Sequence, residues 1–379
     1  MTEGGPPQSG GSQTARSSTA PGAPAPKAHP SQPMASGASD AAPLQDALTA
    51  LAGRLAPGAV AIDALSRLSG GASQETWSFD AVRADGTRIP LILRRPPGGR
   101  GTAEDESMGG TGVGLELEAQ VIRTCAGYGV PVPAVPYVAK PQDGLGTAYV
   151  MSRVEGETIA RKILRNPEFA NARAVMAYQC GAILARIHSV PTGALPGLGI
   201  SDAAQQWQRY RDIYDSFHEP RPVFEYAFRW LKERLPPPDG PVTLVHGDFR
   251  NGNLMIGPEG VRAVLDWELT HLGDPAEDLG WICVNSWRFG VSMKPVGGFG
   301  ELKDLLAGYR QGGGAPIDAE RVYFWTAFGT LKWGIMCMMM VDTFRTGRDR
   351  SVERAAIGRR ASETEIDLMN LLAPQRTDG

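Results

Sequence analysis

Three polar side chains near the middle of the chain have the types and spacing that phosphoryl transfer requires. Asp248 follows His246 and Gly247. Asn253 comes five residues after Asp248, and Asp266 comes 18 residues after Asp248. One carboxylate can orient a substrate hydroxyl and accept its proton, while an amide and a second carboxylate hold Mg²⁺ on nucleotide phosphates. Asp248 is therefore a candidate catalytic base, and Asn253 and Asp266 are candidate metal ligands.

The sequence between these residues predicts a β-hairpin that would bring the metal ligands together. Two short apolar strands flank the four-residue turn 257–260. If Ile256 pairs with Val261 across this turn, the strands are antiparallel. Their register then places Asp266 opposite Asn251, one diagonal step from the candidate amide. Asp, Asn and Gly are also the commonest turn residues, so each alone could belong to a plain loop, but the ordered set favours chemistry.

The run from His246 to Asn253, together with Asp266, resembles the catalytic core of the aminoglycoside phosphotransferase family, also called the choline-kinase-like family. Residues 269–279, Leu-Thr-His-Leu-Gly-Asp-Pro-Ala-Glu-Asp-Leu, resemble the tail that follows the metal-binding Asp, particularly in the branch fused in some relatives to acyl-CoA dehydrogenase domains. The resemblance covers roughly residues 60–345. It implies the protein-kinase-like fold, which is α+β and bilobal, with a small antiparallel-sheet N-lobe and a larger, mainly helical C-lobe.

Composition and the resemblance together predict three regions. Residues 1–43 contain no Val, Ile, Leu, Phe, Tyr or Trp, so they cannot bury enough apolar surface to offset chain entropy. We expect this N-terminal arm to be disordered. The N-lobe, with the nucleotide-binding sheet and helix, would then span 44–152, and the C-lobe, with the catalytic loop, metal site and substrate pocket, would span 153–379.

The resemblance places the phosphate-binding groups in the N-lobe. A turn between two strands, with Gly70, Gly71 and Ser73, would cover the triphosphate, because small residues let backbone N–H groups approach phosphate oxygens. The strand 89–95 ends in two cations, and Arg94 occupies the place of the usual nucleotide-binding Lys. Arg is a planar bidentate donor rather than a compact point charge, but it should still clamp phosphate.

The remaining nucleotide contacts also follow from the resemblance. Glu118, in a predicted helix, would form an ion pair with Arg94. The strand that ends at Ser152 would lead into the hinge, whose backbone binds the adenine edge, so the segment from Val150 to Arg153 should lie along the base. The implied cofactors are ATP and Mg²⁺, with GTP as an alternative nucleotide that these side chains do not distinguish.

Several roles in the catalytic loop are implied in the same way. Asp248 would orient the acceptor hydroxyl, and Arg250, two residues later, would offset charge on the transferring phosphoryl group. His246 would be structural, and Asp278 would brace the loop. Glu268 could reach the metal or a cationic substrate.

The overall composition narrows the class of partner. Net charge is −3, with 38 basic and 41 acidic residues interspersed, so no basic face is expected to draw nucleic acid or an anionic membrane. There is no apolar core of a secretory signal and no uninterrupted apolar run of about 18 to 20 residues that could span a bilayer, which predicts a cytoplasmic protein. The four Cys are widely separated and in apolar surroundings, as buried thiols are. We expect a small-molecule partner with a hydroxyl group; the sequence does not indicate an oligomeric state.

The residues after Asp266 argue against a protein substrate. Trp267 and Glu268 replace the Phe-Gly of protein kinases, and no Ala-Pro-Glu segment follows. We therefore predict a small-molecule kinase that transfers the γ-phosphoryl group of ATP to a hydroxyl of a metabolite or an antibiotic-like acceptor. The acyl-CoA-associated branch points towards a hydroxylated acyl compound or a similar metabolite.

Two alternatives remain open. The first is a catalytically silent nucleotide-binding scaffold, whose usual signature would be loss of Asp248, Asn253 or Asp266, all of which are present. The second, less favoured, is a metal-dependent phosphoesterase that would use His271 and Asp274 as additional ligands. It would lack a preceding Asp-x-His and a following Gly-Asn-His motif.

Overall fold

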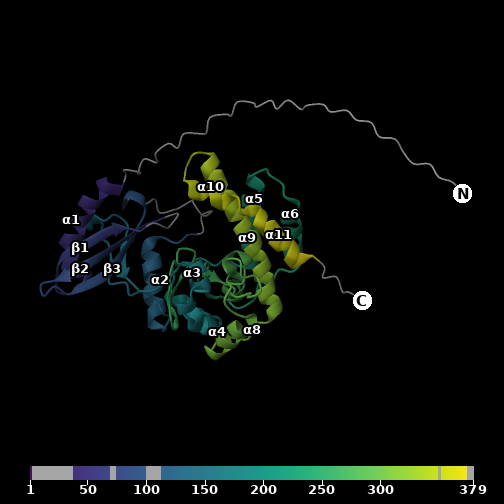
Figure 1. Cartoon of the computed structure of the whole chain (residues 1–379), viewed down its shortest axis with the longest axis horizontal. Helices are drawn as coiled ribbons and strands as arrows, with labels where there is room; N and C mark the ends of the chain where they lie inside the picture. The colour runs from purple at the N-terminus through teal and green to yellow at the C-terminus, as the bar shows by residue number, and fades with distance from the viewer. Residues whose placement is uncertain (2–36, 69–73, 100–111, 349–350, 374–379) are drawn as a thin grey trace, which may run out of the picture.

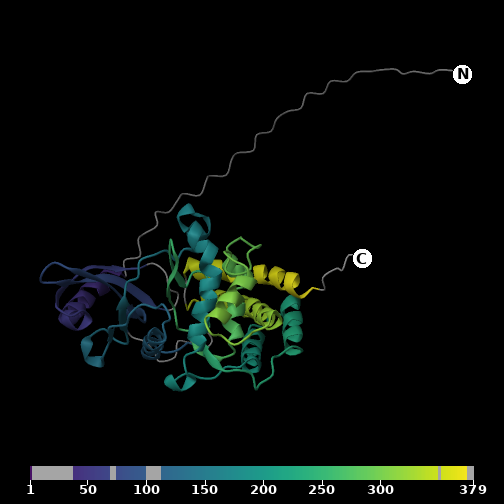
Figure 2. The same cartoon turned by 90° about the horizontal axis from the view of Figure 1, so that it is seen from below.

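The computed structural model describes Met1 and residues 37–68, 74–99, 112–348 and 351–373. The described residues form two lobes, one built on an antiparallel sheet and a larger one that is mainly helical (Figures 1 and 2). In both views the sheet and its helix α1 lie at one end of the molecule, and the remaining long helices gather at the other. The predicted α+β bilobal fold is confirmed.

The N-lobe sheet has five strands in the order β1-β2-β3-β5-β4, and all neighbouring pairs are antiparallel. Its elements are β1 (Ala59–Arg67), β2 (Glu75–Arg83), β3 (Arg88–Arg95), β4 (Tyr137–Val138) and β5 (Tyr149–Ser152), with helices α1 (Gly37–Leu55) and α2 (Leu115–Gly127). Leu48 and Leu51 of α1 are buried in one cluster with Phe79 of β2 and Leu93 of β3. Helix α1 therefore covers one face of the sheet, because its leucines recur at helical spacing.

Helix α1 begins earlier than the composition indicated. It starts at Gly37, so residues 37–43 of the expected disordered arm lie in a helix, and Ala41 packs against the N-lobe core. The physical reason is that alanines favour a helix once Leu44 anchors it, although they bury little apolar surface themselves. The rest of the predicted arm after Met1, residues 2–36, lies outside the described residues.

The C-lobe is formed by helices and two small hairpin-like sheets. Its helices are α3 (Ala160–Arg165), α4 (Ala170–His188), α5 (Ala203–Ser216), α6 (Pro222–Lys232), α7 (Ala276–Trp281), α8 (Leu302–Gln311), α9 (Ala319–Arg345), α10 (Val352–Gly358) and α11 (Ala361–Leu372). Strand β6 (Thr243–Val245) pairs with β9 (His271–Gly273), and β7 (Leu254–Gly257) pairs with β8 (Gly260–Val264). Short 3₁₀ helices span Pro97–Gly99, Pro141–Asp143, Pro167–Phe169, Thr192–Ala194 and Asn285–Arg288.

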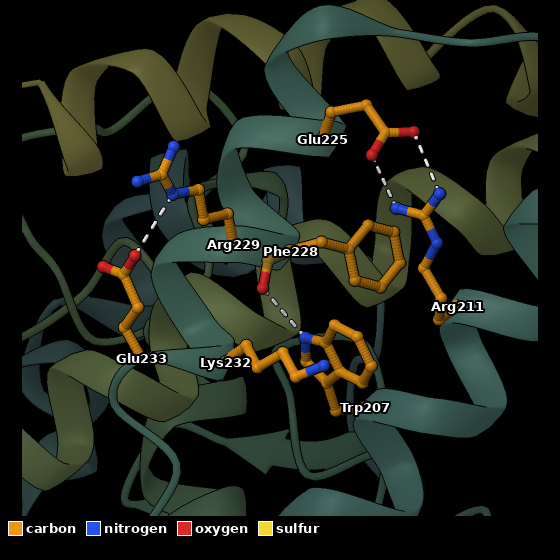
Figure 3. A pocket seen from close by; sticks show the side chains of 7 residues that line it. All are labelled: Trp207, Arg211, Glu225, Phe228, Arg229, Lys232 and Glu233. Carbon is orange, nitrogen blue, oxygen red and sulfur yellow. Dashed lines mark hydrogen bonds and ion pairs between the residues drawn. The ribbon is translucent and has the colours of Figure 1, made fainter.

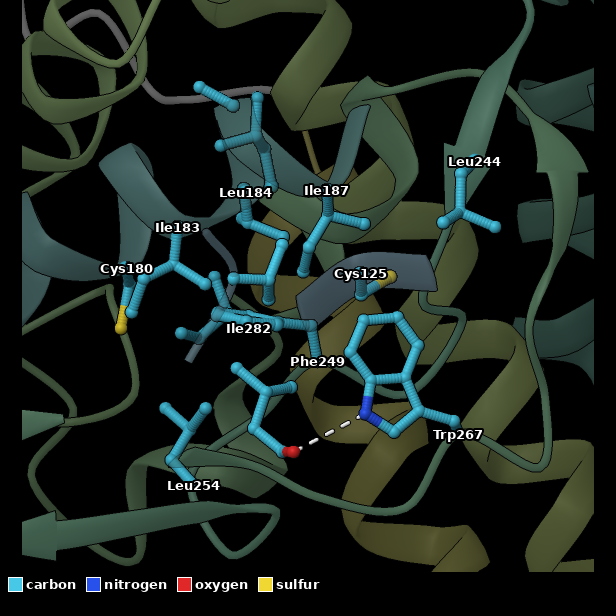
Figure 4. Packing of buried hydrophobic residues seen from close by; sticks show 14 of the residues in the cluster. Cys125, Cys180, Ile183, Leu184, Ile187, Leu244, Phe249, Leu254, Trp267 and Ile282 are labelled. Atoms are coloured by element: carbon cyan, nitrogen blue, oxygen red, sulfur yellow. Dashed lines mark hydrogen bonds between the residues drawn. The ribbon is translucent and has the colours of Figure 1, made fainter. Parts of the chain in front are cut away.

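A tightly packed cluster lies behind the catalytic loop (Figure 4). Phe249 and Trp267 are fully buried in one cluster with Ile183 and Ile187 of α4. The buried residues of α4 recur at helical spacing, so one face of the helix joins this cluster. Cys125 belongs to the same cluster, and burial raises the pKa of its thiol to about 12, which keeps it protonated. The cluster fixes the loop from below.

Helix α9 forms the centre of the C-lobe. It is long and apolar enough to cross a membrane, but 89% of its most apolar window is buried inside the protein. Met336 and Met338 are buried in the same cluster as aromatic residues of α6 and α7, so the Met-rich segment of α9 is part of the core. A charged residue, Lys332, lies buried in the middle of this helix. That exception to an apolar helix is important for the site described below.

Candidate active site

The hairpin that joins the candidate metal ligands forms, with one correction to its register. Ile256 pairs with Val261 as predicted, but a bulge follows, and Met255 pairs with Ala263. The bulge inserts one residue into β8, so Leu265 rather than Val264 lies across from Asn253, with a Leu265 N to Asn253 O distance of 2.9 Å. Asp266 is consequently not opposite Asn251, although it still follows at the same open end.

The turn of this hairpin is also tighter than expected. Gly257 and Gly260 pair with each other, so Pro258 and Glu259 alone form the loop. Gly260 has a φ of 126°, which other residues rarely adopt. The two glycines therefore belong to the strands, and the predicted four-residue turn is a two-residue loop.

The Asp248 carboxylate is held by three donors. Its Oδ1 accepts hydrogen bonds from Arg250 Nε at 2.9 Å and Trp281 Nε1 at 2.7 Å, and its Oδ2 accepts one from Asn253 Nδ2 at 2.6 Å. Its side chain is 13% exposed, so a bound molecule could reach it. A carboxylate fixed in this way can accept a proton without first paying the entropy of orientation. The geometry is suited to a catalytic base.

The loop that carries Asp248 is braced from below by a buried acid, as predicted. Asp278 accepts hydrogen bonds from the backbone N–H groups of His246 at 2.8 Å and Gly247 at 3.0 Å. It also bonds His188 Nε2 at 3.1 Å, which makes His188 a structural residue. Gly247 has a φ of 82°, and a Cβ at this position would lie 2.3 Å from the Leu269 carbonyl oxygen, so only glycine fits this turn.

His246 is structural as well. Its Nδ1 accepts the Asp248 N–H at 3.1 Å, and its Nε2 lies 3.1 Å from the Leu265 carbonyl oxygen, so the neutral Nε2–H tautomer satisfies both contacts. Burial lowers its pKa, which favours the same neutral form. His246 therefore ties the catalytic loop to the strand end that precedes Asp266.

The structure leaves oxygen atoms available at both candidate metal ligands. Asn253 uses its amide N–H groups on Asp248, so its amide oxygen is the atom free for a cation. Asp266 has a φ of 66°, an uncommon conformation for this residue, which is a feature of functional turns. Carboxylate and amide oxygens suit Mg²⁺, which retains other positions for phosphate and water. The two side chains fit a Mg²⁺ ion that is bound together with a nucleotide.

Arg94 reaches across the lobes and joins three polar partners. Its guanidinium lies 3.3 Å from Glu118 Oε1 and 3.0 Å from Asp266 Oδ1, and its Nε donates to Gln74 Oε1 at 3.0 Å. Burial alone would lower the pKa of Arg94, but the neighbouring acidic groups, Glu118 first and then Tyr149 and Asp266, together raise it. Burial would likewise raise the pKa of Asp266, but Arg94 lowers it. Both groups are therefore charged at neutral pH.

Glu118 lies entirely inside the protein beneath Arg94. Besides the guanidinium, its Oε1 accepts hydrogen bonds from Tyr149 Oη at 3.1 Å and the backbone N–H of Trp267 at 3.3 Å. The exposed fraction of Glu118 is 0%. The predicted Arg94–Glu118 pair is thus formed, and it links the β3 strand and the α2 helix to the segment after Asp266 (Figure 1).

The predictions for the segment that binds the adenine base and for the turn that covers the triphosphate have different outcomes. Gly70, Gly71 and Ser73 lie outside the described residues, although the flanking strands β1 and β2 pair as an antiparallel hairpin. Val150 lies between β3 and β4 with an exposed fraction of 0%, and the N–H of Ser152 already donates to the Ala134 carbonyl oxygen at 2.8 Å. The N–H of Arg153 likewise donates to the Pro90 carbonyl oxygen at 3.0 Å, and the expectation that this segment lies along the base stays a prediction.

Sequence reasoning missed Trp281, which donates directly to the candidate base. Trp281 lies three residues after Asp278 in α7, so both residues share the helix face that meets the catalytic loop. This helical spacing was the available signal. Glu268, which the resemblance placed near the metal or a cationic substrate, lies 3.5 Å from Gln74, measured from its Oε2 to Gln74 Nε2.

A cavity of about 350 Å³ lies beside this constellation, between the start of α2, helix α5 and helix α9. Its polar lining includes Ser201, Gln206, Arg209, His271 and Lys332. Lys332 Nζ lies 4.9 Å from the centre of the Trp281 ring, and Trp281 in turn bonds Asp248. The cavity is therefore separated from the candidate base by a single side chain.

A second hollow, of about 340 Å³, lies between α5 and α6 (Figure 3). Its charged side chains bond to one another, Arg211 to Glu225 at 2.6 Å and Arg229 to Glu233 at 3.1 Å. Its indole, Trp207, donates to the Phe228 carbonyl oxygen at 2.9 Å. Because these polar groups already satisfy each other, this hollow is a weaker candidate for a ligand.

Comparison with known proteins assigns the family. Residues 64–314 match the phosphotransferase enzyme family. The chain belongs to this family. The segment 64–314 contains Arg94, Glu118 and the complete catalytic loop, so the family assignment and the geometry concern the same part of the chain.

Sequence relatives and solved structures support the assignment. The chain is 34% identical over 205 residues to mouse acyl-CoA dehydrogenase family member 10, covering 51% of this chain and 18% of that protein. It is 25% identical over 325 residues to an Arabidopsis thaliana protein described as probable acyl-CoA dehydrogenase IBR3, covering 77% and 38%. The chain thus spans well under half the length of these relatives.

The fold is shared with antibiotic phosphotransferases. A Ralstonia eutropha protein assigned as an aminoglycoside phosphotransferase matches with a TM-score of 0.66 and 23% identity over 86% of this chain and 97% of that one. A macrolide 2'-phosphotransferase from Brachybacterium faecium matches with a TM-score of 0.52 and 20% identity over 87% and 98%. At these identities the likeness concerns the fold.

Proposed function

We propose that the protein transfers the γ-phosphoryl group of ATP to a hydroxyl group of a small molecule, with Mg²⁺ bound at Asn253 and Asp266. The observation that carries this proposal is the convergence of Asp248, the two oxygen ligands and Arg94 at one end of a hairpin. These are the parts that phosphoryl transfer requires, namely a base, a metal site and a cation for phosphate.

Asp248 acts on the acceptor. Its carboxylate orients the acceptor hydroxyl and takes its proton while the hydroxyl oxygen forms a bond to the γ-phosphorus. The bond between that phosphorus and the bridging oxygen breaks, and its electron pair leaves with ADP. Arg250, which bonds Asp248 at 2.9 Å, is positioned to offset negative charge on the group in transfer. When bound, Mg²⁺ would neutralise charge on the phosphates.

Arg94 and Asp266 exchange partners when nucleotide binds. Their side chains lie 3.0 Å apart in the structure. A phosphate oxygen can replace the Asp266 carboxylate at Arg94, because a guanidinium presents several donors in a fork. Asp266 would then be one of the residues that hold Mg²⁺. The pair with Glu118 at 3.3 Å stays in place and keeps Arg94 oriented.

The silent scaffold is the second candidate function. The ordered Asp248 carboxylate argues against it, because three donors fix a group that nucleotide binding alone does not need. The names of the relatives favour a hydroxylated acyl compound or similar metabolite as acceptor over an antibiotic. This preference rests on analogy with those proteins.

Phosphorus NMR of reaction mixtures tests the proposed activity. Wild-type protein with Mg-ATP and a panel of hydroxylated small molecules should give ADP together with a new phosphate-ester signal. Release of inorganic phosphate alone, with every acceptor, would contradict transfer to a hydroxyl. Asp248→Asn is the matched control, since it keeps the shape of the side chain and removes the base.

A further inference from the structure

The cavity beside Trp281 is positively charged in a way that the proposed reaction leaves unexplained. Arg209, on α5, is partly exposed, lines the cavity and has no ion pair or hydrogen bond with any residue that the structure describes. Its neighbours along the helix, Gln208 and Arg211, each bond acidic side chains. A guanidinium without a partner at the wall of a cavity is a ready site for an anion.

Lys332 adds a second cation to the same cavity. Its side chain is 8% exposed, and its Nζ lies 3.3 Å from Glu277 Oε1. Glu277 is shared, because its Oε2 also accepts from Gln206 Nε2 at 2.6 Å and lies 3.1 Å from His271 Nε2. The Glu277 carboxylate therefore lies between two basic side chains, Lys332 and His271. Arg209 has no acidic partner among the residues that the structure describes.

The cavity wall contains no opposing acid. Among the described residues that line it, none is Asp or Glu; Glu277 lies behind the wall. The hydroxyl of Ser201, which also lines the cavity, is buried without a hydrogen-bond partner in the part of the chain that the structure describes. Lys332 and Arg209 thus line a space of about 350 Å³, a size that suits a small molecule.

The cavity is placed to hold the far end of an acceptor. Trp281 is the shared element, since its indole N–H bonds Asp248 at 2.7 Å and its ring lies 4.9 Å from Lys332 Nζ. A molecule whose hydroxyl lies at Asp248 would therefore extend past Trp281 towards Lys332 and Arg209. A polycationic acceptor such as an aminoglycoside would meet like charge there.

We propose that this cavity is the acceptor subsite and that Arg209 and Lys332 bind an anionic group, a carboxylate or a phosphate, carried by the hydroxylated acceptor. The proposal rests on the phosphotransferase activity proposed above and specifies its substrate class. Arg209 and Lys332 determine specificity, and they take no part in the transfer itself.

A thermal-shift titration distinguishes binding of an anionic group from binding of a neutral or a cationic group. The protein is saturated with Mg-AMP-PNP, a non-hydrolysable ATP analogue, so that the γ-phosphate position is filled. Butyrate, butyramide, butylammonium and inorganic phosphate are then titrated at constant ionic strength, since a ligand of the folded state raises the Tm by mass action. We expect a saturable rise with butyrate or phosphate and none with the amide or the amine.

Arg209→Gln should weaken the binding of the anion at least about tenfold, which is the loss expected for one hydrogen bond to a charged group. Arg310→Gln is the matched control; Arg310 is an exposed residue near the end of α8, the substitution removes the same charge, and binding should be unchanged. A response to butyrate alone indicates a hydroxy acid, and a response to phosphate alone indicates a phosphorylated acceptor.

The proposal is overturned if neither anion gives a saturable rise, if butylammonium binds as tightly, or if Arg209→Gln responds like wild type. The shift caused by Mg-AMP-PNP is recorded first and separately. Its absence would contradict the proposed phosphotransferase function, whereas its presence without an anion response would contradict only the acceptor subsite.

Discussion

The nucleotide side and the acceptor side of this site are built in different ways. On the nucleotide side, Asn253 and Asp266 lie at the open end of one hairpin, and Arg94 pairs with both Asp266 and Glu118. On the acceptor side, Arg209 and Lys332 come from helices far apart in the sequence, and Arg209 has no ion pair or hydrogen bond among the described residues. Our two proposals together imply that a local motif encodes the metal site and the catalytic base, whereas distant helices encode the choice of acceptor.

Replacement of the catalytic base Asp248 should have the largest effect, and it should affect turnover but not nucleotide binding. Asp248→Asn should lower kcat by about 10²–10⁴-fold, the usual contribution of general acid–base catalysis, because the amide cannot accept the proton. Binding of Mg-ATP should be nearly unchanged, since Asp248 faces the acceptor. Release of ADP measures the first quantity, and the nucleotide-induced Tm shift measures the second. A variant that keeps the wild-type kcat would remove Asp248 from the mechanism.

The nucleotide side should depend on Arg94 for stability as well as binding. Arg94→Met leaves the buried Glu118 without its cation, and breaking such a pair costs about 3–5 kcal/mol of unfolding free energy. Urea denaturation measures the loss. Adding Glu118→Gln to this variant should recover part of the stability but none of the nucleotide binding.

The neighbouring Arg95 provides the control. It is also buried and paired, 3.1 Å from Glu75, but on the other face of the strand. Arg95→Met should destabilise the N-lobe yet retain the Mg-ATP-induced Tm shift. Loss of nucleotide binding in both variants to the same degree would show that Arg94 has only a structural role.

Trp281 connects the two sides, and its loss should affect the chemical step. Trp281→Phe removes the 2.7 Å hydrogen bond to Asp248, and one bond to a charged group is worth about tenfold in kcat. The KM for ATP should stay the same. Trp333→Phe is the matched control, because its indole N–H has no partner among the described residues. Equal effects of both changes on kcat would mean that Trp281 acts through packing.

The buried network behind the acceptor cavity should make a smaller, pH-dependent contribution to stability. Burial would raise the pKa of Glu277, but His271 and Lys332 lower it to about 2 from an ordinary value of 4.5, so its contribution is lost as pH falls from 4.5 towards 2. Burial would lower the pKa of His271, but Glu277 raises it above 6.5, so that contribution is lost as pH rises through the raised value. The Tm difference between wild type and Glu277→Gln should be largest between about 4.5 and 6.5.

Melting curves recorded from pH 3 to pH 9 check this prediction. The difference between the two proteins should shrink at both ends, and more completely on the acidic side, because Lys332 still pairs with Glu277 at high pH. A difference that does not vary with pH would exclude the charged His271–Glu277 contact.

The parts of the fold that could be predicted from sequence were those with local signals. The strand that ends at Arg94 and Arg95 and the hairpin that follows the loop from His246 to Asn253 have local sequence signals, and both form in the structure. The bulge after Ile256 left no comparable signal, because a single inserted residue does not disturb the apolar pattern of a short strand.

The parts that could not be predicted depend on contacts between distant segments. Val150 pairs with a strand on each side, and only the order of strands in the sheet shows this. Lys332 is a single charge within an apolar stretch of sequence, and its position near Trp281 follows from the packing of α9 on α7. The acceptor side is therefore visible only in three dimensions.

The Mg²⁺ dependence of nucleotide binding tests the central claim most directly. Wild type and Asp266→Asn are titrated with ATP and with GTP, each with and without Mg²⁺, and the Tm is recorded. Our account predicts a rise in Tm that requires Mg²⁺ in wild type and is lost in Asp266→Asn. No shift in wild type, or an equal Mg²⁺-dependent shift in both proteins, would contradict the assignment of Asp266 and of the nucleotide site.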